Sequence, residues 1–215
     1  MDREQFYKLY WRHYLSIERD FLNTDEYVSI NVKNSPTFSN AYSKLFLTIC
    51  SEIDSLSVEF CRLIKNDNDK KSYFNEGIIP RMNTITEVYP GINTIKITTK
   101  FPYDEQNFVP FSKLTNEMMP DWWHSYNEYK HERTGETATG QPHYEKACLK
   151  NVITSLAALY LLCYLIDDYF DERNDRMDCV SGFFEFNGGK IVKNVVIHEV
   201  KSEEMKESTK KEELT

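Results

Sequence analysis

The residues of this chain best suited to chemistry lie together in one short stretch, residues 120–135. Asn127 and His131 are four residues apart, so on a helix they share one face. Lys130 and Arg133 add two cations beside that histidine. A histidine can transfer a proton at neutral pH, an amide can orient it, and a cation can neutralise a bound phosphate. The spacing therefore indicates a small catalytic or binding site with these four side chains as its candidate catalytic residues.

Aromatic residues on the same stretch suggest how a nucleic acid could be held. Trp122, Tyr126 and Tyr129 would stack on unpaired bases if their rings were exposed, at about 1–3 kcal/mol for each base. We therefore take them as candidate RNA-binding residues. The same pattern also fits a core helix, in which the rings face inward and the polar groups are satisfied by the backbone or by neighbours. The sequence leaves both interpretations open.

Helices are expected to position this stretch. Apolar residues at helical spacing predict helices over residues 3–22 and 42–65, and a weaker one over 70–88 that is interrupted by a glycine and a proline. The candidate site lies on a short helix that begins near Pro120. The longest helix is expected over residues 144–171, and its nearly continuous apolar surface places it at the centre of a bundle.

Two segments have β-strand patterns, and the C-terminal residues have no pattern of regular structure. Residues 94–98 alternate like a short strand, and residues 182–192 contain an Asn-Gly pair between strand-like runs, which predicts a β-hairpin. We expect a mainly α protein, a four- to five-helix bundle over residues 1–176 with a small C-terminal β-hairpin over 177–201. Residues 202–215 are almost wholly polar or charged and are expected to form a flexible tail.

Composition narrows the class of protein. At 215 residues the chain can bury a core of its own, and the 14% aromatic content excludes a disordered chain. The net charge of −8 argues against a surface made for non-specific nucleic-acid binding. The five cysteines are scattered without a ligand-like spacing, as in reduced cytosolic proteins. We expect a cytoplasmic protein without a membrane segment, since the longest apolar run, residues 152–166, is shorter than the roughly 20 residues needed.

Two metal sites are conceivable alternatives. Glu128-x-x-His131 has the spacing used by di-iron bundles, and Glu18 and Glu52 could add carboxylates, but the chain has no second Glu-x-x-His. Asp167-Asp168-x-x-Asp171 resembles the run that holds Mg²⁺ and diphosphate in all-α isoprenoid synthases. No facing acidic motif accompanies it, so it reads better as a helix end that enters solvent. We therefore expect no metal and no cofactor.

Nucleophile motifs are missing as well. The chain has no Gly-x-Ser-x-Gly, no phosphate-binding loop and no His-Glu-x-x-His. Cys148 and Cys163 lie in the apolar helix and are expected to be buried, unreactive thiols.

The order of these motifs resembles the HEPN superfamily of helical bundles. The resemblance rests on a long helix pair, on the aromatic helix and on the start of the last helix. Its residues are Trp122-Trp123-x-x-Tyr126-Asn127-x-x-Lys130-His131-x-Arg133, then Asn151 ahead of Leu156-Ala157-Ala158-Leu159. It covers roughly residues 1–172.

The resemblance implies a homodimer, RNA as substrate and a role in toxin–antitoxin or phage-defence systems, with an antitoxin-like protein as a further partner. Family members pair an Arg with a His four to six residues later and cut RNA without metal through the ribose 2′-hydroxyl. His131 matches the family histidine and Asn127 the polar residue after the arginine. The arginine itself has no counterpart, because its positions hold His124, Ser125 and Tyr126. An inactive helical module that binds a protein partner is the alternative.

Overall fold

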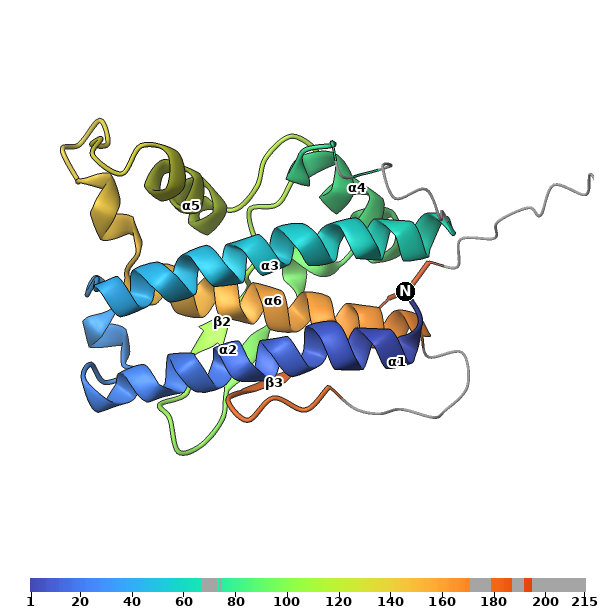
Figure 1. Cartoon of the computed structure of the whole chain (residues 1–215), viewed down its shortest axis with the longest axis horizontal. Coiled ribbons are helices and arrows are strands. Elements are labelled where there is room, and N and C mark those ends of the chain that lie inside the picture. Colours follow the sequence, from blue (N-terminus) through green and yellow to red (C-terminus); the bar gives the residue numbers. More distant parts are fainter. Residues whose placement is uncertain (67–72, 74, 171–178, 187–191, 195–215) are drawn as a thin grey trace, which may run out of the picture.

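Three long helical segments form the centre of the fold, described here from a computed structural model of residues 1–66, 73, 75–170, 179–186 and 192–194 (Figure 1). The first consists of α1 (Arg3–Phe6), a π-helical turn η1 (Tyr7–Trp11) and α2 (Arg12–Leu22). The others are α3 (Asn40–Lys65) and α6 (Leu149–Phe170). The colour order in Figure 1 shows α3 and α6 running in the same direction and α2 in the opposite one. The prediction of a mainly α protein is confirmed.

The first helix differs from its predicted pattern at one turn. Leu9 follows the buried Phe6 at α-helical spacing, yet it is 64% exposed, whereas Trp11 is buried. Trp11 follows the buried Phe6 by five residues, the separation that the i→i+5 hydrogen bonds of the π-helical turn span. The wider turn therefore rotates Leu9 outward and places the larger indole ring in the core.

Helix α3 begins and ends as its sequence predicts. The hydroxyl of Ser39 accepts a hydrogen bond from the backbone N–H of Tyr42 and caps the start of the helix. Asn66 ends it with a φ of 50°, a left-handed conformation that asparagine tolerates better than most residues. Among the described helices and strands, α3 and α6 form the most extensive contact with each other.

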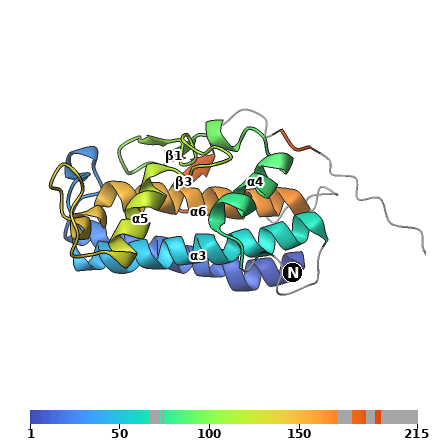
Figure 2. The same cartoon turned by 90° about the horizontal axis from the view of Figure 1, so that it is seen from above.

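A small antiparallel sheet covers α6 on the side away from α3 (Figure 2). Its strands lie in the order β2 (Asn107–Phe108), β1 (Ile97–Thr99), β3 (Phe184–Phe186). Phe184 stacks on Tyr160 of α6 and Phe186 on Tyr164, with ring centroids 5.9 and 5.1 Å apart. These two stacks attach the sheet to the central helix.

The C-terminal strand has a partner that the sequence did not predict. β3 pairs with β1, 85 or more residues earlier, with Ile97 opposite Phe186 and Thr99 opposite Phe184. Phe183 and Phe184 are fully buried in the same core as the helices. Burying these two rings requires the strand to reach across α6. The Asn-Gly turn at residues 187–188 and the tail at 202–215 lie outside the described residues.

Shorter elements complete the fold. They are η2 (Asn23–Glu26), η3 (Val32–Asn34), α4 (Ile78–Val88), η4 (Ile92–Thr94), α5 (Asp121–His131) and η5 (His143–Lys146). Helices α4 and α5 both pack against α3 (Figure 1). The predicted helix over residues 144–171 therefore begins later, because residues 143–146 form a separate 3₁₀ turn.

A buried polar joint ties α2 to the segment before β3. Glu18 is 4% exposed, and its carboxylate accepts hydrogen bonds from the Tyr14 hydroxyl at 2.6 Å and from the Gly182 N–H at 2.9 Å. The Ser181 hydroxyl donates to the same carboxylate and accepts the N–H groups of the two residues that follow Gly182. Every polar atom of this joint therefore has a partner inside the core.

Among the described residues, α6 is long and apolar enough to cross a membrane by length and composition. However, 78% of its most apolar window is buried inside the fold. Its surface is therefore used by the core of this domain.

Candidate functional site

Helix α5 carries the predicted site, and aromatic packing holds it in place. Pro120 precedes the helix and Asp121 opens it, where a negative charge favours the positive end of the helix dipole. Trp122 donates its indole N–H to the carbonyl of Pro110 at 2.8 Å. Tyr126 meets Phe46 of α3 edge to face, with centroids 6.0 Å apart. These contacts fix the orientation of α5 on the bundle.

The aromatic residues of α5 face the core. Trp122, Trp123, Tyr126 and Tyr129 are 4%, 6%, 5% and 3% exposed. A base can stack only on an open ring face. Trp122, Tyr126 and Tyr129 have no exposed ring face on which a base could stack, as was predicted for them. We therefore assign these rings to the core. Their positions at i, i+1, i+4 and i+7 form the inner stripe of an amphipathic helix.

The predicted polar residues gather at the other face and at the end of α5. Lys130, His131 and Arg133 are exposed, and Asn127 is half-buried. The Lys130 ammonium lies 5.4 Å from the centroid of the Tyr126 ring, and the Arg133 guanidinium lies 4.3 Å from that of Tyr129. Each cation thus makes a cation–π contact with a buried ring. The two cations and His131 form a cationic end of α5, which we call the α5 tip.

A residue that the sequence reasoning missed shapes the loop after the α5 tip. His143 is 5% exposed, and its Nδ1 lies 2.8 Å from the carbonyl oxygen of Glu132. Gly135 packs directly against this ring, because a Cβ atom there would lie 2.8 Å from Nδ1 of His143. The glycine therefore allows the loop to fold back onto the histidine, which holds the segment that carries Arg133. The only sequence signal for this contact was the presence of His143 directly after a loop rich in Gly, Thr and Pro.

A cavity of 460 Å³ opens beside the start of α5 and the start of α6. Its walls come from four segments of the chain: the loop before α3, α5, η5 and the first turn of α6. The residues are Ser35, Pro36, Asp121, Ser125, Gln141, Glu145, Lys146, Cys148, Lys150 and Asn151. None of the four candidate catalytic residues is among them, although Lys146 also faces Glu128 of α5 at 3.7 Å. We call this cavity the α5–α6 pocket.

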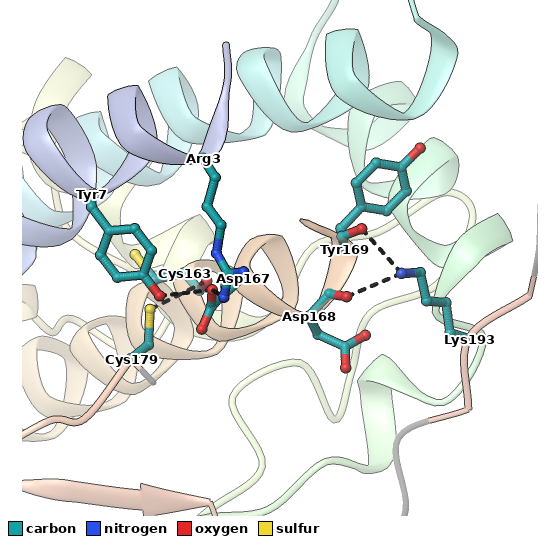
Figure 3. Close-up of polar contacts among 8 residues, drawn as sticks. All are labelled: Arg3, Tyr7, Cys163, Asp167, Asp168, Tyr169, Cys179 and Lys193. Carbon is teal, nitrogen blue, oxygen red and sulfur yellow. Dashed lines mark hydrogen bonds and ion pairs between the residues drawn. The ribbon is translucent and has the colours of Figure 1, made fainter. Parts of the chain in front are cut away.

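The two described aspartates at the end of α6 accept hydrogen bonds from other segments of the chain. Asp167 is 6% exposed and accepts hydrogen bonds from Arg3 Nη2 at 3.1 Å and from the Tyr7 hydroxyl at 2.7 Å (Figure 3). Asp168 turns the other way and accepts from Tyr89 at 3.0 Å. The expectation of a solvated helix end is thus wrong for Asp167, which ties α6 to the N-terminal helix. Asp171 lies outside the described residues.

Two of the groups around Asp167, Tyr7 and Cys179, are held in their protonated, neutral forms. Burial, and then the bond to Asp167, raises the pKa of Tyr7 well above its ordinary value. Burial likewise raises the pKa of the Cys179 thiol, which lies beside the same carboxylate (Figure 3). A phenol and a thiol that keep their protons can donate to the carboxylate, so this cluster is a joint between segments.

The end of α6 is closed by the last described segment. Lys193 places its ammonium 3.0 and 3.1 Å from the backbone carbonyls of Asp168 and Tyr169 (Figure 3). A cation there complements the negative end of the helix dipole. The next residue, Asn194, donates its backbone N–H to Val88 and its side-chain amide to the carbonyl before it, at the end of α4. Residues 192–194 therefore cap two helices at once.

The carboxylates considered for a di-iron site have other partners within the described residues. Glu18 is committed to the joint with Ser181, and the carboxylate of Glu52 faces His13 at 3.9 Å. Within the described parts of the chain, no three His, Cys, Asp or Glu side chains are placed to hold a metal ion. Glu128 of the Glu128–His131 pair faces Lys146, as noted above.

Comparison of the chain with protein-family models, with curated proteins and with solved structures gave no match.

Proposed function

We propose that this chain is a HEPN-like helical protein that binds RNA at the α5 tip and cuts it without a metal ion. The exposure of His131 between two cations, on a helix anchored by four buried rings, is the observation that supports this. A reactive group needs both access to substrate and a rigid support, and this residue has both. The resemblance in the order of motifs adds the expectation of a cytoplasmic homodimer in a toxin–antitoxin or phage-defence system.

The reaction assigns one role to each polar residue. The ribose 2′-hydroxyl would attack the adjacent phosphorus, and the P–O5′ bond would break to leave a 2′,3′-cyclic phosphate. His131 would transfer the proton, as general base or general acid. Lys130 and Arg133 would neutralise the charge that grows on the phosphate oxygens, which compensates for the missing family arginine. Asn127 would orient the histidine or the ribose from one turn earlier on the same face.

The test is cleavage of labelled single-stranded and transfer RNA in EDTA. His131→Ala is compared with His124→Ala, which removes another exposed histidine from the same helix. General acid–base catalysis typically contributes a factor of about 10²–10⁴, so His131→Ala should lose at least a hundredfold while His124→Ala keeps its activity. Equal cleavage by all three proteins would remove His131 from the mechanism and point to a contaminating nuclease.

A second candidate function is an inactive module that binds a protein partner. The burial of the four rings favours it, because they leave no stacking surface for bases. Absence of cleavage, with all variants folded, would support this function. Charge reversal at Lys130 and Arg133 should then weaken self-association or partner binding, measured by light scattering and by titration with the purified partner. Unchanged association would place the interface elsewhere on the chain.

A further inference from the structure

A second cavity, of 540 Å³, opens between β2, the loop before α3 and the first turns of α6. Val32, Phe108 and Ile153 form its apolar walls, and Val32 is 66% exposed. The volume falls within the range of about 300–1,000 Å³ that is usual for ligand sites. We call this cavity, which shares Ser35 and Lys150 with the α5–α6 pocket, the β2 pocket.

The edge of the sheet beside this pocket is open. β2 is an outer strand, since the strand order among the described residues is β2, β1, β3. The N–H of Thr99 donates to the carbonyl of Gln106, so the backbones of these two residues are hydrogen-bonded. Bonded and non-bonded pairs alternate along an antiparallel ladder. In the next pair, Thr98 and Asn107, the N–H and carbonyl of Asn107 therefore point away from β1. Asn107 also lines the β2 pocket.

An amide in the wall of the pocket lacks a partner. Gln106 lines the β2 pocket, and its Nε2 atom is buried without a hydrogen-bond partner among the described residues. A buried donor usually has an acceptor, because leaving it unpaired destabilises the fold. A carbonyl group of a bound molecule would supply that acceptor. Together with the open strand edge, the unpaired amide favours a ligand rich in peptide groups.

The charged residues of the pocket are of both signs. Lys150, in the first turn of α6, is exposed and lines the pocket. Glu105, which comes before β2, is also exposed, and Asp104 accepts a hydrogen bond from the side-chain amide of Asn31. Two carboxylates beside one lysine disfavour a polyanion such as RNA at this surface. A peptide with an apolar residue between an acidic and a basic one matches both the charges and the apolar walls.

We propose that the β2 pocket binds an extended segment of a partner protein, which adds to the open edge of β2 as a further strand. The N–H and carbonyl of one residue of the segment pair with the backbone of Asn107. The residues on either side of it direct their side chains into the cavity, because side chains alternate along a strand. A carbonyl of the segment accepts the Gln106 amide, and its charged side chains meet Lys150 and Glu105. The surface is separate from the α5 tip, so the proposal does not depend on RNA chemistry.

The probe is a library of short random peptides displayed on phage and selected on the full chain. The enriched peptides are synthesised with a fluorescent label and titrated by anisotropy. We expect them to share an apolar residue between an acidic and a basic one. Val32→Asp should weaken their binding by about tenfold or more, because it places a charge in the apolar wall. Val192→Asp, on a valine 62% exposed outside the pocket, is the matched control and should leave binding unchanged.

Methylation of single backbone nitrogens in the peptide tests the strand pairing without altering the protein. In a strand paired with β2, alternate N–H groups of the peptide face the edge and the others face away. Methylation at the facing positions should weaken binding by about tenfold, the size of one lost hydrogen bond. Methylation at the positions between them should change binding by less than about twofold.

Several results would overturn the proposal. One is a selection in which no peptide is enriched on the full chain. Another is equal affinity of the peptides for the unchanged chain, Val32→Asp and Val192→Asp, which would place their binding elsewhere. Losses on methylation that do not alternate along the peptide would exclude a strand. Displacement of the peptides by a uridine oligonucleotide would assign the surface to RNA instead.

Discussion

Replacing Glu18 tests whether the buried joint between α2 and the C-terminal segment stabilises the fold. Glu18→Ala removes the acceptor of three hydrogen bonds. The Tyr14 hydroxyl keeps its second contact, to the Ser181 oxygen at 3.3 Å, so two donors are left without an acceptor. At about 1–3 kcal/mol for each stranded donor, the loss is roughly 2–6 kcal/mol, and removing a buried charge offsets part of it. We expect the free energy of unfolding to fall by about 3 kcal/mol.

The matched control is Glu26→Ala, which removes the same charge from an exposed position in η2. It should change the free energy of unfolding by less than about 0.5 kcal/mol. Glu18→Gln keeps one carbonyl acceptor and should fall between the two. Urea unfolding at neutral pH, followed by tryptophan fluorescence, measures all four proteins, and similar m-values are needed for the comparison. Equal free energies of unfolding for Glu18→Ala and Glu26→Ala would refute the reasoning. The buried hydrogen bonds of Glu18 would then stabilise the fold no more than the hydration of an exposed glutamate does.

Three further predictions concern other parts of the fold. Gly135→Ala should lose about 1–3 kcal/mol in urea unfolding, since its Cβ would meet His143 at 2.8 Å. Gly77→Ala, with no atom within 4 Å, should change stability by less than about 0.5 kcal/mol, and a loss as large at Gly77 would contradict the contact argument. Lys193→Gln removes the cation from the end of α6 and should cost about 1 kcal/mol in thermal unfolding at low salt, and less at high salt. Buried thiols and phenols have pKa values above their ordinary 9.0 and 10.0, so the unfolded chain releases these protons first. Stability should therefore fall as the pH rises above about 9, and an unchanged urea midpoint at pH 11 would contradict the burial of these groups.

The long helices were predictable because each depends on local pattern. Apolar spacing predicted a helix over residues 42–65, and α3 spans Asn40–Lys65. The site was only partly predictable. The sequence placed Asn127 and His131 on one face, but it could not separate an inward from an outward aromatic stripe, because Trp and Tyr suit both.

The features that the sequence did not predict depend on contacts between distant segments. β3 pairs with β1, and no local signal encodes that pairing. Cys148 was assigned to the buried helix because the apolar run appears continuous. The 3₁₀ turn of residues 143–146 ends just before it and leaves the thiol at the helix boundary. Long-range packing decided both cases, and it overrides local propensity.

The position of the buried joint in the chain has a consequence for its synthesis. The groups that donate hydrogen bonds to Glu18, on Ser181 and Gly182, lie 163 and 164 residues later in the chain. Asp167, which binds Arg3, follows after a similar interval. A ribosome that adds 5–20 residues per second needs roughly ten to thirty seconds to supply them. Throughout that time α2 can form as a helix, but the Glu18 carboxylate on it has no donors in a core. In the nascent chain, the Glu18 carboxylate can therefore enter this joint only after Ser181 and Gly182 have been synthesised, and chaperones have that interval in which to bind the chain.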